Sequence, residues 1–158
     1  MISLSDFLKV EAVRLDVEAT DKTELLNEMA GWLADAGLID ESGRRTLAER
    51  LIQREQMGST CVGRRLALPH SHLESLSDPV IGFARLVRPI DFGPPEGLEV
   101  DLVFLLVVPS GDTLLELRAI SKLCRVLKDD RFVADLRAAA SPEDVKKAFE
   151  EVEARHLG

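Results

Sequence analysis

A short stretch in the middle of the chain gathers residue types suited to handling a phosphoryl group. His70 follows Pro69, and a neutral imidazole is a competent nucleophile near pH 7. Phosphoryl transfer depends mostly on positioning and charge stabilisation, so the phosphoryl oxygens need hydrogen-bond donors. Arg54 offers a planar fork that matches such oxygens, and the hydroxyls of Ser59 and Thr60 add further donors. These four residues form our candidate site.

The residues alone leave other interpretations open. A histidine beside a proline is more often structural than catalytic. His70 and His72 share a strand face and resemble half of a metal site, but zinc needs further ligands and the remaining histidine is His156, near the C-terminus. Ser59, Asp101 and His70 form a hydrolase triad on paper, but the Gly-x-Ser-x-Gly pattern is missing. We predict neither a metal site nor a bound cofactor.

Length and composition narrow the class of protein. The chain has 158 residues, which fits one domain, so we treat residues 1–158 as a single unit. A net charge of −8 argues against nucleic-acid binding, which relies on basic contacts to phosphates. The longest apolar run, Leu102–Val108, is much shorter than the roughly 18 residues of a membrane span. With no signal peptide visible, we expect a cytoplasmic protein without membrane insertion.

Apolar patterns predict an α/β fold. Strands are expected at 13–17, 59–62, 66–68, 80–87 and 100–108, from alternating or continuous apolar residues. Helices are expected between Asp21 and Gly37, from about Ser42 to near Gly58, from Asp112 to Leu127, over 132–139 and after Ser141. The segment 93–97 is expected to be a loop. The pattern indicates a mixed β-sheet of about five strands with helices on both faces.

Three segments carry a resemblance to a known family. They are Arg54–Glu74, Arg88–Phe92 and Val100–Pro109. Together they resemble the fructose/mannitol-type IIA components of the bacterial phosphoenolpyruvate-dependent phosphotransferase system, and the nitrogen-regulatory branch is nearest. The resemblance implies that family's fold. It also implies that His70 accepts a phosphoryl group on Nε2 from a histidine phosphocarrier protein (HPr/NPr-like). Arg54, Ser59 and Thr60 match the family's site residues.

The chain departs from the family pattern at several positions. Arg64 and Arg65 stand where the family usually has Asn-Gly, and His72 stands where it usually has Lys or Arg. Glu116 aligns with the family's second active-site histidine. A carboxylate pointing into the site repels a phosphohistidine. We hypothesise that Arg64 or Arg65 offsets that charge, and that Glu116→His lengthens the lifetime of the phosphorylated form.

The resemblance implies a phosphotransferase component that works through a phosphohistidine intermediate. Two destinations for the phosphoryl group stay open: a IIB component in sugar uptake, or retention as a signal that controls a regulatory target such as a transporter or kinase. A third interpretation is a degenerate binding module that no longer accepts phosphate, with Glu116 as its mark.

Overall fold

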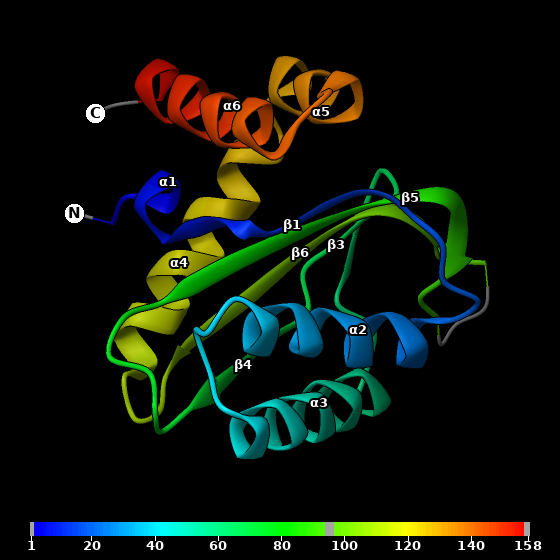
Figure 1. Cartoon of the computed structure of the whole chain (residues 1–158). Coiled ribbons are helices and arrows are strands. Elements are labelled where there is room, and N and C mark those ends of the chain that lie inside the picture. Colours follow the sequence, from blue (N-terminus) through cyan, green and yellow to red (C-terminus); the bar gives the residue numbers. More distant parts are fainter. Residues whose placement is uncertain (1, 94–96, 157–158) are drawn as a thin grey trace.

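A mixed six-stranded sheet forms the centre of the computed structural model, which describes residues 2–93 and 97–156 (Figure 1). The strands are β1 (Leu8–Val17), β2 (Cys61–Gly63), β3 (Leu66–Ala67), β4 (His70–Leu73), β5 (Val80–Asp91) and β6 (Glu99–Pro109). Their order is β1-β5-β6-β3-β2, and β4 also pairs with β6. The pairs β5–β6 and β2–β3 are antiparallel, whereas β1–β5, β3–β6 and β4–β6 are parallel. The mixed sheet was predicted, with about five strands rather than six.

Helices cover both faces of this sheet, as predicted. They are α1 (Leu4–Phe7), α2 (Lys22–Asp35), α3 (Glu41–Gln56), α4 (Thr113–Val126), α5 (Asp130–Ala138) and α6 (Pro142–Arg155). Figure 1 shows α2 and α3 on one side of the sheet and α5 and α6 on the other. Leu105 of β6 packs with α2 and α3, whereas Leu106 packs with α4, α5 and α6. Strand β6 is therefore apolar on both faces, which explains its continuous apolar run.

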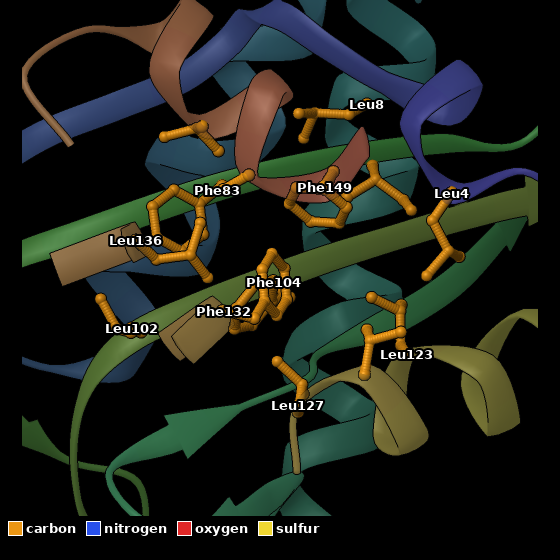
Figure 2. Packing of buried hydrophobic residues seen from close by; sticks show 14 of the residues in the cluster. Leu4, Leu8, Phe83, Leu102, Phe104, Leu123, Leu127, Phe132, Leu136 and Phe149 are labelled. Atoms are coloured by element: carbon orange, nitrogen blue, oxygen red, sulfur yellow. The ribbon is translucent and has the colours of Figure 1, made fainter. Parts of the chain in front are cut away.

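Phenylalanine rings join the sheet to its C-terminal helices (Figure 2). The ring centroids of Phe83 and Phe104, on neighbouring strands, lie 5.0 Å apart. Phe149 of α6 lies 6.3 Å from Phe104 and 5.0 Å from Phe132 of α5, both times edge to face. Such offset aromatic pairs contribute more than their buried area alone. The rings thereby fix α5 and α6 against the sheet.

Two predicted helix starts are confirmed, whereas the helix expected over 132–139 begins two residues earlier, at Asp130. The carboxylate of Asp21 accepts the N–H of Glu24 at 2.8 Å, and the hydroxyl of Ser141 accepts the N–H of Asp144 at 3.2 Å. Both are N-caps that satisfy a free backbone donor in the first turn. In the ranges that the structure describes, no helix is both long and apolar enough to cross a membrane. Positions 94–96 of the expected loop lie outside the described residues.

Several strand boundaries differ from the prediction. Strand β2 covers Cys61–Gly63 rather than 59–62, and β5 continues to Asp91 rather than ending at residue 87. The sequence suggested a strand that stops at Pro69, with His70 just beyond its end, but β3 stops at Ala67 and His70 opens β4. Proline lacks an N–H group and interrupts the ladder, although the chain continues as a strand after it. Strand β1 starts at Leu8, whereas the prediction began at Val13. A register irregularity between these two residues breaks the apolar alternation on which the prediction was based. The short helix α1 was not predicted.

Candidate active site

The imidazole of His70 is held by its own main chain. His70 is half-buried and pairs with Leu106 of β6, next to Pro69, whose carbonyl accepts the N–H of Leu106. Its Nδ1 lies 2.8 Å from the carbonyl oxygen of Leu68. A carbonyl only accepts, so Nδ1 carries the proton and donates it. Nε2 therefore keeps its lone pair in the neutral ring, which makes it the nucleophilic nitrogen.

His72 and Glu116 line one cavity. His70 and His72 pair with Leu106 and Val108 of β6, so both imidazoles project from the face of the sheet that α4 covers. The cavity has a volume of about 230 Å³, and its lining includes His72, Asp112, Thr113 and Glu116. The structure thus places Glu116 in the cavity that His72 lines.

A polar cluster supports His72 from the other side. Its Nδ1 lies 2.6 Å from Oγ of Ser110, and its carbonyl accepts Nη1 of Arg50 at 2.8 Å. Arg50 also forms an ion pair with Glu74 at 2.9 Å. The hydrogen bond from Arg50 holds the pKa of Glu74 at about 2. Glu74 is therefore an anion at any physiological pH, and the Arg50 charge beside His72 is already partnered.

Arg54 lies in the last turn of α3, and Ser59 lies in the segment between α3 and β2. Nη1 of Arg54 donates to the carbonyl of Gly58 at 2.8 Å, which leaves the other guanidinium donors for a ligand. Oγ of Ser59 accepts the N–H of Cys61 at 3.0 Å. Because that hydroxyl acts as an acceptor here, its own proton is available. Both residues therefore offer donors of the kind that phosphoryl oxygens need.

Thr60 is committed to a buried carboxylate. It is 6% exposed, and Glu55, which is 2% exposed, accepts both its hydroxyl and its N–H, the latter at 3.2 and 3.3 Å from the two carboxylate oxygens. The carbonyl of Thr60 accepts the N–H of Leu68 at 3.0 Å. Thr60 is thereby linked to His70 through Leu68. A direct contact between its hydroxyl and phosphate stays a prediction.

Arg64 and Arg65 form the two-residue loop between β2 and β3. Their φ angles are 56° and 65°, the left-handed conformation that suits Asn-Gly in a tight hairpin. The guanidinium of Arg64 binds the carboxylate of Asp130 and the carbonyl of Leu127 at 3.0 Å. Within residues 2–93 and 97–156, no ion pair joins Glu116 to either arginine. Arg64 thus neutralises Asp130, and the suggested offset of Glu116 finds no contact to support it.

The hydrolase alternative is not assembled. The carboxylate of Asp101 accepts Nη2 of Arg137 at 2.8 Å, and Nδ1 of His70 faces Leu68 rather than an acid. His156, the third histidine considered for a metal, follows the last residue of α6. Its Nε2 lies 2.8 Å from the carboxylate of Asp129.

Sequence reasoning missed Glu55. The spacing of Leu47, Leu51 and Glu55 puts all three on one face of α3, and all three are buried. That i+4 spacing was the available signal, since a charged residue on a buried stripe needs partners. The role of the Leu68 carbonyl left no such signal, because every residue has a main-chain carbonyl and the residue type does not show which one binds a side chain.

Comparison with known proteins gives a consistent picture. Residues 6–152 match the family model described as the phosphoenolpyruvate-dependent sugar phosphotransferase system, EIIA 2. A nitrogen regulatory protein from Bradyrhizobium diazoefficiens is 36% identical over 142 residues, covering 90% of this chain and 91% of that protein. The nitrogen regulatory protein IIA-Ntr from Neisseria meningitidis has a similar structure, with a TM-score of 0.80, 28% identity, and coverage of 92% of this chain and 98% of that chain.

A third similarity concerns the fold alone. It is to the complex of enzyme IIAMTL and phosphorylated enzyme IIBMTL from Escherichia coli, with a TM-score of 0.73 and 18% identity. The match covers 91% of this chain and 99% of that chain. The family model spans nearly the whole chain, and the similar sequences and the structure of IIA-Ntr agree with it. The chain belongs to the EIIA 2 family of the phosphoenolpyruvate-dependent sugar phosphotransferase system.

Proposed function

We propose that this chain is a phosphoryl carrier that accepts its phosphoryl group on Nε2 of His70 from a histidine phosphocarrier protein (HPr/NPr-like). The observation that carries the proposal is the hydrogen bond from Nδ1 of His70 to the Leu68 carbonyl at 2.8 Å. It reserves the lone pair of Nε2 for the incoming phosphorus. Membership of the family supports a role as a phosphotransferase component, and such a donor places the reaction in the cytoplasm.

The transfer step is a displacement between two imidazoles. Nε2 of His70 attacks the phosphorus of the carrier's phosphohistidine in line with the leaving nitrogen. The new P–N bond forms as the old one breaks, and the bonding electron pair returns to the carrier's ring. The positive charge that develops on the His70 ring strengthens its Nδ1–H bond to Leu68. Arg54 and Ser59 supply donors for the oxygens in transfer.

The onward route has two candidates. A IIB component is the acceptor in a sugar-uptake chain, which the family description and the fold shared with the IIAMTL component support. Alternatively, the group stays on His70 as a signal, and its charge of about −1.5 to −2 switches affinity for a regulatory target. The 36% identity with a nitrogen regulatory protein favours this second route.

Intact mass spectrometry tests the carrier role. The protein is incubated with phosphoenolpyruvate, enzyme I and a histidine phosphocarrier. We expect one acid-labile phosphoryl group on the wild type and on the control His156→Ala, and none on His70→Ala, because the hydrogen bond from Nδ1 of His70 to Leu68 leaves Nε2 of that ring as the acceptor. The control removes a histidine from the far end of α6, where it contacts Asp129.

A wild type that gains no mass, while a IIA protein of known activity is labelled in parallel, would contradict the carrier role. That result would instead favour a degenerate binding module, whose partner is then sought by pull-down. If labelling succeeds, transfer to a purified IIB component separates sugar uptake from retention as a signal.

A further inference from the structure

Glu55 and Lys22 are a charged pair that helix physics alone does not explain. Glu55 lies in the last turn of α3 and Lys22 opens α2. Each therefore sits at the helix end where the macrodipole disfavours its charge. Burial adds to the cost, because Glu55 is 2% exposed. Residues that violate local rules in this way mark sites where another requirement dominates.

The pair joins several segments that are distant in sequence. Nζ of Lys22 lies 3.5 Å from the Glu55 carboxylate, and it donates to the carbonyls of Phe92 and Gly93 at 3.1 and 2.6 Å. On the other side, the same carboxylate accepts the N–H and the hydroxyl of Thr60. The start of α2, the end of α3, the end of β5 and the segment before β2 are thereby held together.

From Thr60 a chain of hydrogen bonds leads to the catalytic ring. The carbonyl of Thr60 accepts the N–H of Leu68 at 3.0 Å, and the carbonyl of Leu68 accepts Nδ1–H of His70 at 2.8 Å. Leu68 is 2% exposed, so water does not compete for either bond. The direction and strength of the Leu68 carbonyl thus depend on where Thr60 is held, and Thr60 is held by Glu55.

We propose that Glu55 is a positioning residue for His70: through Thr60 and Leu68 it fixes the ring in the Nδ1–H tautomer, with Nε2 free to accept phosphorus. The catalytic part of this inference rests on the proposed function, whereas the tautomer itself does not. Without the hydrogen bonds between Glu55 and Thr60, the ring exchanges with the Nε2–H tautomer, in which a proton occupies the attacking lone pair. A wrong tautomer lowers catalysis even when the geometry is otherwise intact.

The test combines tautomer and rate. Protein carrying ¹⁵N-labelled histidine is studied by long-range ¹H–¹⁵N NMR at pH 8, and phosphoryl acceptance is timed by intact mass. In Glu55→Gln we expect His70 to become a mixture of tautomers and acceptance to slow by about tenfold or more. Thr60→Val, which keeps the main-chain bonds and removes only the hydroxyl, is expected to shift both readouts in the same direction.

Glu153→Gln is the matched control. Glu153 is also a poorly exposed carboxylate paired with a lysine, since it lies 2.8 Å from Nζ of Lys122, but it binds the N–H groups of Leu4 and Ser5 in α1 rather than any group near His70. We expect this variant to lose stability while the tautomer of His70 and the acceptance rate stay those of the wild type. The control separates general destabilisation from loss of the hydrogen bonds between Glu55 and Thr60.

The outcomes are distinguishable. A pure Nδ1–H tautomer and an unchanged rate in both Glu55→Gln and Thr60→Val overturn the inference, as does an Nε2–H tautomer in the wild type. If Glu55→Gln does not fold, Thr60→Val decides. A wild type that accepts no phosphoryl group overturns the proposed function instead, and the tautomer comparison then still decides whether Glu55 positions the ring.

Discussion

His70 meets two opposing influences at the scale of single residues. The Leu68 carbonyl keeps its Nε2 available. His72 lies two residues farther along the same strand face, and it lines a cavity together with Asp112 and Glu116, which both have carboxylate side chains. Positions i and i+2 of a strand lie about 7 Å apart, which is within the screening length of about 10 Å at physiological salt. A phosphoryl group on His70 therefore experiences repulsion from this cavity.

Glu116→His is expected to lengthen the lifetime of phosphorylated His70. The substitution removes a negative charge from the cavity and adds a ring that donates a hydrogen bond. We expect the acid-labile mass increment to decay several times more slowly than in the wild type, which a time course of intact mass measures. Glu116→Gln is the control that removes the charge without adding an imidazole. An unchanged lifetime in both variants would show that Glu116 does not face the phosphoryl group.

At the scale of elements, the β2–β3 hairpin carries conformational strain. Arg64 and Arg65 both have positive φ angles, and this conformation costs roughly 1–2 kcal/mol for a residue with a Cβ. Arg64 is partly compensated by its contacts to Asp130 and Leu127. The carbonyl of Arg65 accepts the N–H groups of Asp101 and Leu102, and a glycine there keeps these bonds. Arg65 is thus the better position for relief.

Arg65→Gly is expected to raise the free energy of unfolding by about 1 kcal/mol, since the relief of strain exceeds the added freedom of glycine in the unfolded chain. Urea denaturation with an unchanged slope measures it. Gly63→Ala is the opposite control: Gly63 also has a positive φ, of 89°, so a Cβ there is expected to destabilise the same hairpin. A lower stability of Arg65→Gly would contradict this account of the hairpin.

At the scale of the whole molecule, Glu153 ties three helices together. Its carboxylate accepts Lys122 of α4 at 2.8 Å and the N–H groups of Leu4 and Ser5 at 2.7 and 2.9 Å. Burial by itself raises the pKa of Glu153, but these hydrogen bonds outweigh it, so the pKa lies below its ordinary value. A lowered pKa in the folded state means that the stabilisation is complete above the unfolded pKa and is lost as pH falls through the folded one.

Glu153→Gln is therefore expected to cost about 2 kcal/mol at pH 7, the typical loss for a hydrogen bond to a charged group. The difference from the wild type is expected to shrink as pH falls below the unfolded-state pKa of glutamate, about 4.3, because the unfolded chain binds a proton there and the folded chain binds it only at lower pH. Urea midpoints between pH 3 and pH 7 measure this. Glu151→Gln, at an exposed pair with Lys147, is the control and should change little. A gap that stays constant with pH would contradict the argument.

Much of this fold was predictable because its signals are local. The apolar run of β6 and the N-caps at Asp21 and Ser141 each depend on a few neighbouring residues, and the structure confirms them. Strand β4 was not predicted, because Pro69 interrupts the pattern and the strand exists only by pairing with β6. Strand β1 was predicted only from Val13 onward, since a bulge breaks its alternation.

The candidate site was predictable in its residue types and not in its connections. His70, Arg54 and Ser59 stand out as a nucleophile and donors from type and order alone. The link from Glu55 to His70 runs through main-chain atoms of Thr60 and Leu68, and sequence does not encode which carbonyl meets which ring. Likewise, Arg64 or Arg65 was expected to offset the charge of Glu116, but Arg64 forms its ion pair with Asp130, a partner 66 residues away.

The pairing of β4 with β6 has a consequence for the order of folding. Strands β5 and β6 are neighbours in sequence and form an antiparallel pair. Strand β4 is a parallel partner of β6, and the whole of β5 lies between these two strands in the sequence. Closing a longer loop costs more entropy, so local pairs form early and distant parallel pairs late. We expect His70 to reach its place only after β5 and β6 have paired. A chain that is still being synthesised, before β6 has left the ribosome, would then carry no positioned His70 and could not take phosphoryl groups from its donor.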